Sequence, residues 1–169
     1  MATALLIARL LLGGALFAHG AQKLLGWFGG YGIKGTGGFM ETLGFRPGSL
    51  FAAAAGLGEV GGGLLTALGL GGPIGPALII MVMLVAILTV HLPNGFWQTA
   101  NGYELNTMNI AGALTFAFVG FGPFSLDAIV GLSGVWSDTL RWIVIGIAVL
   151  FALGNLAVRR TERTAQPAA

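Results

Sequence analysis

Three polar side chains near the end of the first apolar segment could take part in proton transfer or hydrogen bonding. His19, Gln22 and Lys23 are spaced i, i+3 and i+4, so on a helix they share one face. An imidazole can give or take a proton near neutral pH, and an ammonium group donates up to three hydrogen bonds. Lys23 alone is typical of a residue that extends to the lipid headgroups. Three polar residues on one face of an apolar helix favour a binding site.

A carboxyl group lies deep in the second apolar segment. Glu59 is roughly 13 Å from the start of that segment, at 1.5 Å per residue. An ionisable group inside hydrocarbon costs at least about 2.5 kcal/mol on insertion scales, so we expect Glu59 to be protonated or to be paired with Lys23, His19 or Arg9. The structural alternative is a carboxyl group hydrogen-bonded across helices with no chemistry of its own. Arg9 lies near the opposite end of the first segment, and we expect it to extend outward to the headgroups.

A second histidine ends the third apolar segment, and a polar loop follows it. His91 alone would be typical of a helix cap. Because successive membrane helices alternate in direction, the ends of segments one and three, the start of segment two and the loop 93–104 meet at one membrane face. We therefore predict one shared polar site. Its predicted reactive groups are Glu59, His19 and His91, and its predicted binding groups are Lys23, Gln22, Asn101 and Glu104.

Composition places these residues in a membrane protein. Of the 169 residues, 56% are hydrophobic and 8% are charged, whereas soluble domains carry about 25% charged residues. The 30 glycines lie within apolar runs, where small residues let helices approach closely. The spacing of Gly58 and Gly62 would let a second helix or a flat ligand lie close to Glu59.

The absence of cysteine and the small net charge exclude several kinds of site. Without cysteine, the chain cannot supply thiolate ligands or a disulfide, so we expect no metal site, and redox chemistry would need a bound cofactor or a partner protein. The net charge is +2, with the basic residues in linkers and tail, which makes nucleic acid an unsuitable partner.

The apolar segments predict an all-α membrane protein with four core transmembrane helices and a fifth helix at the C-terminus. A membrane helix needs about 20 residues, and the fourth segment is the shortest. We expect a single transmembrane domain over residues 1–158, with the core at about 4–130, and a short basic tail at 159–169. The predicted helices span residues 4–25, 49–70, 74–92, 105–121 and 140–158.

The long glycine-rich linker 26–48 is predicted to cover one end of the bundle. Thr36 could cap one or two helical turns that end at Gly44, and nearby aromatic side chains suit the membrane interface.

Charge distribution predicts the orientation in the cell membrane. With five spans, one face holds Lys23, Lys34, Arg46, Arg159, Arg160 and Arg163, whereas the other holds only Arg9 and Arg141. Cytoplasmic loops carry an excess of basic residues. We therefore expect the N-terminus outside the cell and the C-terminus in the cytoplasm.

Several short motifs, taken in order, resemble those of the DoxX family of small membrane proteins over about residues 4–130. The motifs are Arg9, His19-Gly20-x-x-Lys23, Gly35-Thr36-x-x-Phe39-Met40, Glu59-x-x-Gly62-Gly63, His91-Leu92-Pro93-Asn94-Gly95-Phe96 and Asn101-Gly102-Tyr103-Glu104. The family is named for a subunit of an archaeal thiosulfate:quinone oxidoreductase, and some members are described as membrane partners of oxidoreductase or oxidative-stress systems. The resemblance implies a helical membrane fold and a shared polar site. The implied site residues are His19, Lys23, Glu59, His91, Asn101 and Glu104.

Three functions fit these residues. The first is a membrane subunit of an oxidoreductase system that binds quinone near the cytoplasmic face. Its partners would be the lipid membrane, an oxidoreductase protein and possible further copies of this chain. The second is a non-enzymatic membrane anchor or a small-solute permease. The third is a haem b protein with His19 and His91 as axial ligands, which an absorption spectrum would reveal. The substrate and the electron donor stay open.

Overall fold

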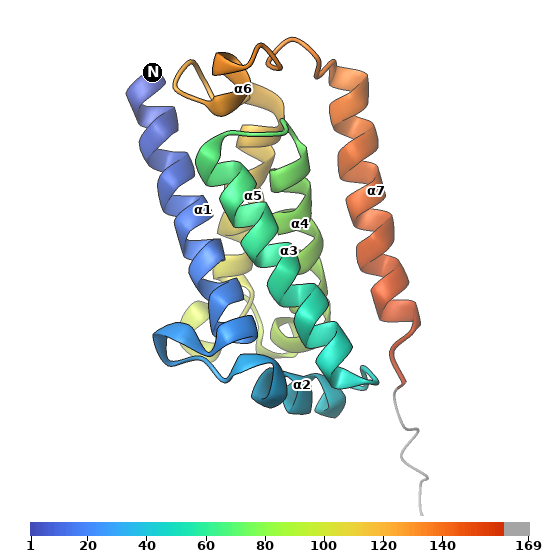
Figure 1. Ribbon diagram of the computed structural model, residues 1–169. Coiled ribbons are helices and arrows are strands. Elements are labelled where there is room, and N and C mark those ends of the chain that lie inside the picture. Colours follow the sequence, from blue (N-terminus) through green and yellow to red (C-terminus); the bar gives the residue numbers. More distant parts are fainter. Residues whose placement is uncertain (161–169) are drawn as a thin grey trace, which may run out of the picture.

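The computed structural model describes residues 1–160, and within that range the protein is a helical bundle with seven α-helices (Figure 1). The predicted tail beyond Arg160, including Arg163, lies outside the described residues. The α-helices are α1 (Ala2–Leu25), α2 (Gly32–Thr42), α3 (Gly48–Leu68), α4 (Ile74–Ala86), α5 (Glu104–Val119), α6 (Leu126–Ile129) and α7 (Asp138–Ala157).

Four helices of the described chain are long and apolar enough to cross a membrane. They are α1, α3, α4 with its continuation to Asn94, and α7. The 16 residues of α5 fall short of the roughly 20 that span a bilayer, yet α5 runs between the same two ends of the bundle as its neighbours (Figure 1). The predicted all-α membrane fold, including the extra C-terminal helix, is confirmed.

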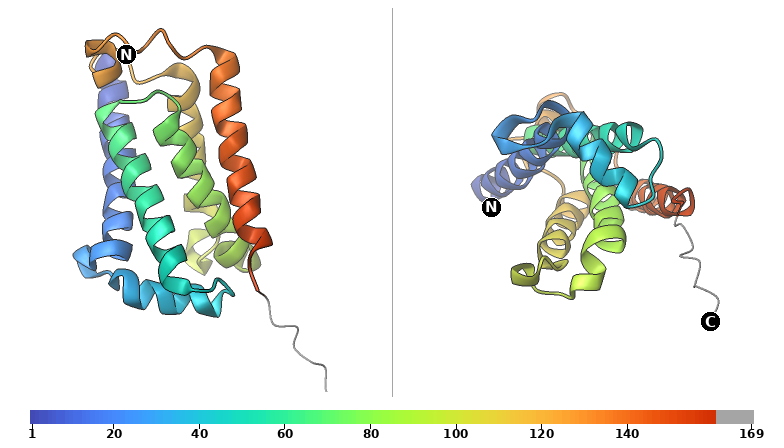
Figure 2. Two further views of the ribbon diagram at one scale, coloured as in Figure 1. Left: turned by 45° about the vertical axis from the view of Figure 1, so that its right-hand side comes forward. Right: turned by 90° about the horizontal axis from the view of Figure 1, so that it is seen from below.

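The bundle has two distinct ends. We call one the α2 end, where the linker 26–47, the loop 92–103 and the last residues of α7 meet, and the other the α6 end, where Met1, the turn 69–73 and the segment 120–137 meet (Figure 1). Seen from below in Figure 2, α2 lies across the α2 end, beneath α1 and α3. The predicted cover over this end is therefore present.

Close packing of α1 on α3 depends on glycine. A Cβ atom on Gly13 would lie 2.4 Å from the carbonyl oxygen of Gly63, and one on Gly63 would lie 2.6 Å from that of Gly13. Further along, a Cβ atom on Gly20 would lie 2.7 Å from the carbonyl oxygen of Gly56. These backbones meet without side chains between them, which is the use of small residues expected between membrane helices.

The glycines that flank Glu59 pack against α4. A Cβ atom on Gly58 would lie 2.8 Å from the side chain of Val82, and one on Gly62 would lie 3.0 Å from the carbonyl oxygen of Gly75. Of the two uses predicted for this pair, close approach of a helix is the one the structure adopts.

The start of α2 differs from the prediction. This helix begins at Gly32, and its N-cap is Tyr31 with no side-chain capping bond. Thr36 is therefore not a cap, because it lies in the middle of the helix with its side chain buried. Gly37 explains the closeness of α2 to α3, since a Cβ atom there would lie 3.0 Å from the backbone nitrogen of Ser49.

The last turn of the third membrane segment is wider than an α-helix. After Ala86, residues Ile87–His91 form a π-helical turn, and a 3₁₀ turn, Leu92–Asn94, follows. Such π-helical segments are rare and occur frequently at functional sites. The turn carries His91 to the α2 end.

Candidate functional site

The buried carboxyl group of Glu59 forms an ion pair with Lys23. The Nζ atom of Lys23 lies 2.6 Å from Oε2 and 2.8 Å from Oε1 of Glu59. The Glu59 side chain is 4% exposed and that of Lys23 is 28% exposed. Of the partners that the sequence allowed, the structure selects the lysine one helix away, so the acid has a counter-charge inside the apolar bundle.

His19 is held by a short chain of hydrogen bonds on the same helix. Its Nδ1 atom lies 3.1 Å from Oε1 of Gln22, and Nε2 of Gln22 donates to the carbonyl oxygen of Phe28 at 3.2 Å. Phe28 lies in the 3₁₀ turn Trp27–Gly29 that leads from α1 to α2. The linker therefore fixes the Gln22 amide, which in turn positions the imidazole.

His91 is held by the backbone of the polar loop. Its Nδ1 atom lies 2.8 Å from the carbonyl oxygen of Asn101, which also accepts a hydrogen bond from Nδ2 of Asn94 at 3.2 Å. Asn101 adopts a left-handed backbone conformation with φ 59°, which asparagine tolerates better than most residues. This turn directs its carbonyl to the histidine.

A cavity of about 630 Å³ joins these groups. Its volume lies in the range of small-molecule sites, about 300 to 1,000 Å³. Apolar side chains such as Leu16, Phe39 and Val82 form much of its wall. The lining also includes six of the seven predicted site residues, namely His19, Gln22, Lys23, Glu59, His91 and Asn101.

The cavity is confined to the α2 end of the bundle. Along α1 its lining begins at Leu16, which is 1% exposed, and along α5 it ends at Asn109. One turn beyond, the side chain of Leu12 lies 3.2 Å from the position of a Cβ atom on Gly112, so α1 and α5 touch there. A second cavity of about 570 Å³, lined by the end of α1 and the start of α2, shares part of its lining with the first, including Gln22 and Lys23.

Glu104 occupies a different place from the other predicted residues. It is the first residue of α5, and its Oε2 accepts a hydrogen bond from the backbone nitrogen of Gln98 at 2.9 Å. Its backbone nitrogen donates to the carbonyl oxygen of Phe96 at 2.8 Å. Glu104 therefore shapes the loop that carries Asn101, and it does not line the cavity.

Sequence reasoning missed two asparagines of α5 that line the cavity. Nδ2 of Asn106 lies 3.4 Å and Nδ2 of Asn109 lies 3.6 Å from the sulfur of Met83 on α4. Their i, i+3 spacing puts them on one face of an otherwise apolar helix, and that spacing was the signal that could have identified them. Thr36 and Thr89 line the same cavity.

A sequence model of the DoxX family matches residues 4–92, which is more than half of the chain. The chain belongs to the DoxX family. The match covers α1 to α4 and includes His19, Lys23, Glu59 and His91, whereas the resemblance inferred from the motifs extended to about residue 130. Comparisons with curated proteins and with solved structures found no match.

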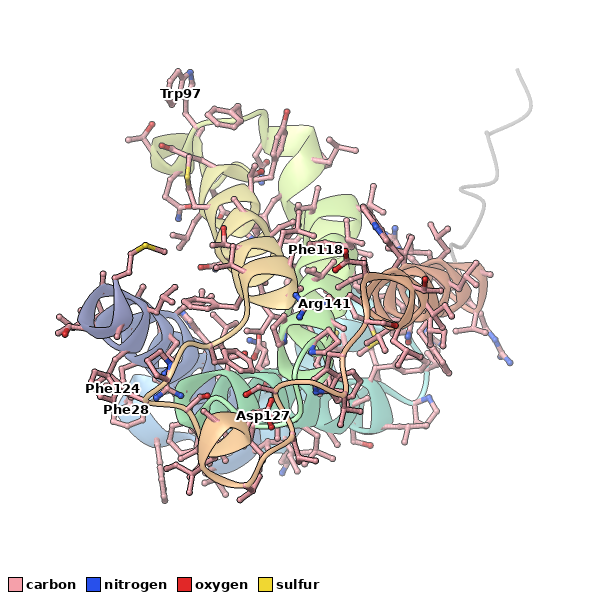
Figure 3. The ribbon with its side chains drawn as sticks, turned by 90° about the horizontal axis from the view of Figure 1, so that it is seen from above. Phe28, Trp97, Phe118, Phe124, Asp127 and Arg141 are labelled. Atoms are coloured by element: carbon pink, nitrogen blue, oxygen red, sulfur yellow. The ribbon has the colours of Figure 1, made fainter. Side chains whose placement is uncertain are left out.

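The α6 end of this DoxX family protein is closed by the segment 120–137. The carboxylate of Asp127 accepts hydrogen bonds from the backbone nitrogens of Gly71 at 2.9 Å and Gly72 at 2.7 Å. The guanidinium of Arg141 donates to the carbonyl oxygens of Trp136, Ala117 and Phe118. Figure 3 looks down on this end of the bundle and shows Asp127 and Arg141 there.

The position of the Arg9 side chain differs from the prediction. Its side chain was expected to extend outward, but it is 2% exposed and donates a hydrogen bond to the carbonyl oxygen of Phe124. The segment 120–137 crosses the α6 end and covers the guanidinium, so Arg9 is buried beneath protein. It does not join the cavity at the α2 end.

Replacing Asp127 with alanine is expected to loosen the α6 end without affecting the cavity. The change removes two hydrogen bonds to a charged acceptor, each worth about 1.5 to 3 kcal/mol, and leaves two glycine N–H groups unpaired. We expect faster proteolysis within residues 120–137 and a lower melting temperature. Asp138→Asn is the matched control, because the Asp138 side chain is 91% exposed. Equal proteolysis of both variants would contradict the bracing role of Asp127.

Proposed function

We propose that this DoxX family protein is a membrane subunit of an oxidoreductase system and that the cavity at its α2 end binds the ring of a quinone. The observation that carries the proposal is the convergence of the Lys23–Glu59 ion pair and two histidines on one cavity with largely apolar walls. Proton-carrying groups beside an apolar cavity suit a ligand that is itself apolar and changes its protonation with its redox state.

The shape of the cavity supports a binding site over a passage for solutes. Its lining is confined to the α2 half of the bundle, and Leu16 together with the contact of Leu12 on Gly112 closes it toward the α6 end. A channel-type permease needs a route that opens to both faces at once. A blind cavity suits a ligand that enters from one side and stays bound while a partner protein reacts with it.

The proposed orientation places the cavity near the cytoplasm. Among the described residues, the α2 end carries Lys23, Lys34, Arg46, Arg159 and Arg160, whereas Arg9 and Arg141 lie toward the α6 end. The basic excess at the α2 end supports a cytoplasmic position for this end of the bundle. The N-terminus would then lie outside the cell.

The test is binding of a short-tail ubiquinone, supplied as decylubiquinone or as its reduced quinol, to the purified chain in lipid nanodiscs. We expect saturable binding of at least one form. Glu59→Gln is expected to weaken that binding at least about tenfold, or about 1.4 kcal/mol, because it removes the carboxylate and releases Lys23. Asp138→Asn should bind as the wild type does. Unchanged binding by a folded Glu59→Gln protein would refute the proposed role of the acid.

The same preparation distinguishes the other two functions. A haem b protein with His19 and His91 as ligands would show a Soret band. An anchor would bind neither form of the quinone, and alanine substitutions at His19 and His91 would lower only its expression and melting temperature. Either result would replace the quinone proposal.

A further inference from the structure

The proton positions on both histidines can be assigned from their partners. Nδ1 of His91 faces the carbonyl oxygen of Asn101 at 2.8 Å. A carbonyl oxygen only accepts hydrogen bonds, so Nδ1 carries the proton. In the neutral imidazole the other nitrogen, Nε2, is then an acceptor with a free lone pair.

The same assignment holds for His19 through one more hydrogen bond. Nε2 of Gln22 donates to the carbonyl oxygen of Phe28, which leaves Oε1 of Gln22 facing Nδ1 of His19 at 3.1 Å. An amide oxygen only accepts, so His19 also carries its proton on Nδ1. Within the part of the chain that the structure describes, neither Nε2 atom has a hydrogen-bond partner.

The asparagines of α5 add two more acceptors. Because Nδ2 of Asn106 and of Asn109 is directed to the sulfur of Met83, the Oδ1 atom of each amide is left without a partner among residues 1–160. An amide oxygen cannot donate. The lining residues of α1, of the π-helical turn Ile87–His91 and of α5 therefore carry four acceptor atoms that no donor within residues 1–160 satisfies.

Several donors around the cavity are engaged. Lys23 donates to both oxygens of Glu59, Gln22 donates to Phe28, and Thr89 donates to the carbonyl oxygen of Val85 at 2.7 Å. The third N–H of Lys23 and the second N–H of each lining amide are still able to donate. Exposed side chains such as Gln98 and Tyr31 can serve as both donor and acceptor. A hydroxyl group both donates and accepts, so it can pair with the four acceptors and with these donors, whereas a carbonyl oxygen pairs with the donors alone.

We propose that the cavity binds the reduced, dihydroxy form of its ligand, an aromatic diol of the quinol type, more tightly than the oxidised quinone. The inference rests on the proposed function and adds the redox state of the bound species. A quinol has two O–H donors for the Nε2 and Oδ1 acceptors. A quinone has only carbonyl acceptors. It would leave the Nε2 and Oδ1 atoms without a donor and would bring its own oxygen lone pairs close to theirs. Sites built to hydrogen-bond a hydroxyl group discriminate strongly against analogues that lack it.

The test is a series of three ligands bound anaerobically to the full chain in nanodiscs: decylubiquinol, decylubiquinone and the dimethyl ether of decylubiquinol. The ether keeps the ring and tail but has no O–H group. We expect the quinol to bind at least about tenfold more tightly than the quinone, and the ether to bind no better than the quinone. His91→Phe and His19→Phe should each reduce the ratio of quinol to quinone affinity.

Three binding results would overturn the inference. Quinone binding equal to or tighter than quinol binding would refute the preference and leave the proposed quinone site standing. Binding of none of the three ligands would refute both proposals. If the histidine variants do not fold, the three wild-type affinities still decide the question. An ether that binds as tightly as the quinol would show that the hydroxyl hydrogens are not recognised.

Discussion

Replacing Lys23 with methionine is expected to destabilise the protein by about 3 kcal/mol, since removing one partner of a buried ion pair leaves the other charge uncompensated. The remaining carboxylate of Glu59 is 4% exposed within the bundle, and Lys23 is the cation paired with it. We expect a melting temperature lower by on the order of 10 °C in thermal unfolding of the purified protein in detergent.

Replacing Glu59 instead of Lys23 should destabilise the protein less. In Glu59→Gln the ammonium group of Lys23 is left, and its side chain is 28% exposed, so it can turn toward the headgroups on its flexible stem. The double variant Lys23→Met/Glu59→Gln should recover most of the stability lost in Lys23→Met, because no charge stays buried. Lys34→Met, on an exposed lysine of α2, is the control. Additive losses in the double variant would show that the two charges do not stabilise each other.

The sequence was a good guide to the membrane helices because their apolar runs are long and end at glycine or at polar residues. The predicted ends of α1, α3 and α7 lie within two residues of those observed. Pairing of Glu59 with Lys23 was one of the alternatives left open by the sequence, since a carboxyl group at that depth is either protonated or paired with a cation. The convergence of His19 and His91 followed from the alternating directions of the helices.

Two errors have a common cause in contacts that local patterns do not encode. Arg9 was assigned to the headgroups because nothing in residues 120–137 signals that this segment folds back across the α6 end. Thr36 was assigned as a cap because threonine is a preferred N-cap residue. The helix starts one turn earlier, at Gly32, and packs closely on α3 at Gly37.

Replacing Gly13 with alanine is expected to cost about 3 kcal/mol, at the upper end of the usual cost of overpacking. The added methyl group would lie 2.4 Å from the carbonyl oxygen of Gly63 and 2.6 Å from the backbone nitrogen of Ala67. Neither backbone atom can move without displacing a helix, so α1 must separate from α3. A larger residue, as in Gly13→Val, should abolish the folded protein, which gel filtration in detergent would detect.

The neighbouring glycine provides a matched control, because a Cβ atom on Gly14 would meet nothing within 4 Å. Gly14→Ala should be neutral or stabilising by up to about 1 kcal/mol through helix propensity. The separation of α1 from α3 would also move Lys23 away from Glu59, so Gly13→Ala should weaken ligand binding as well as stability, whereas Gly14→Ala should change neither adversely. Equal melting temperatures for the two variants would mean that α1 and α3 are not packed backbone to backbone, and the position of Lys23 over the acid would then lose its structural basis.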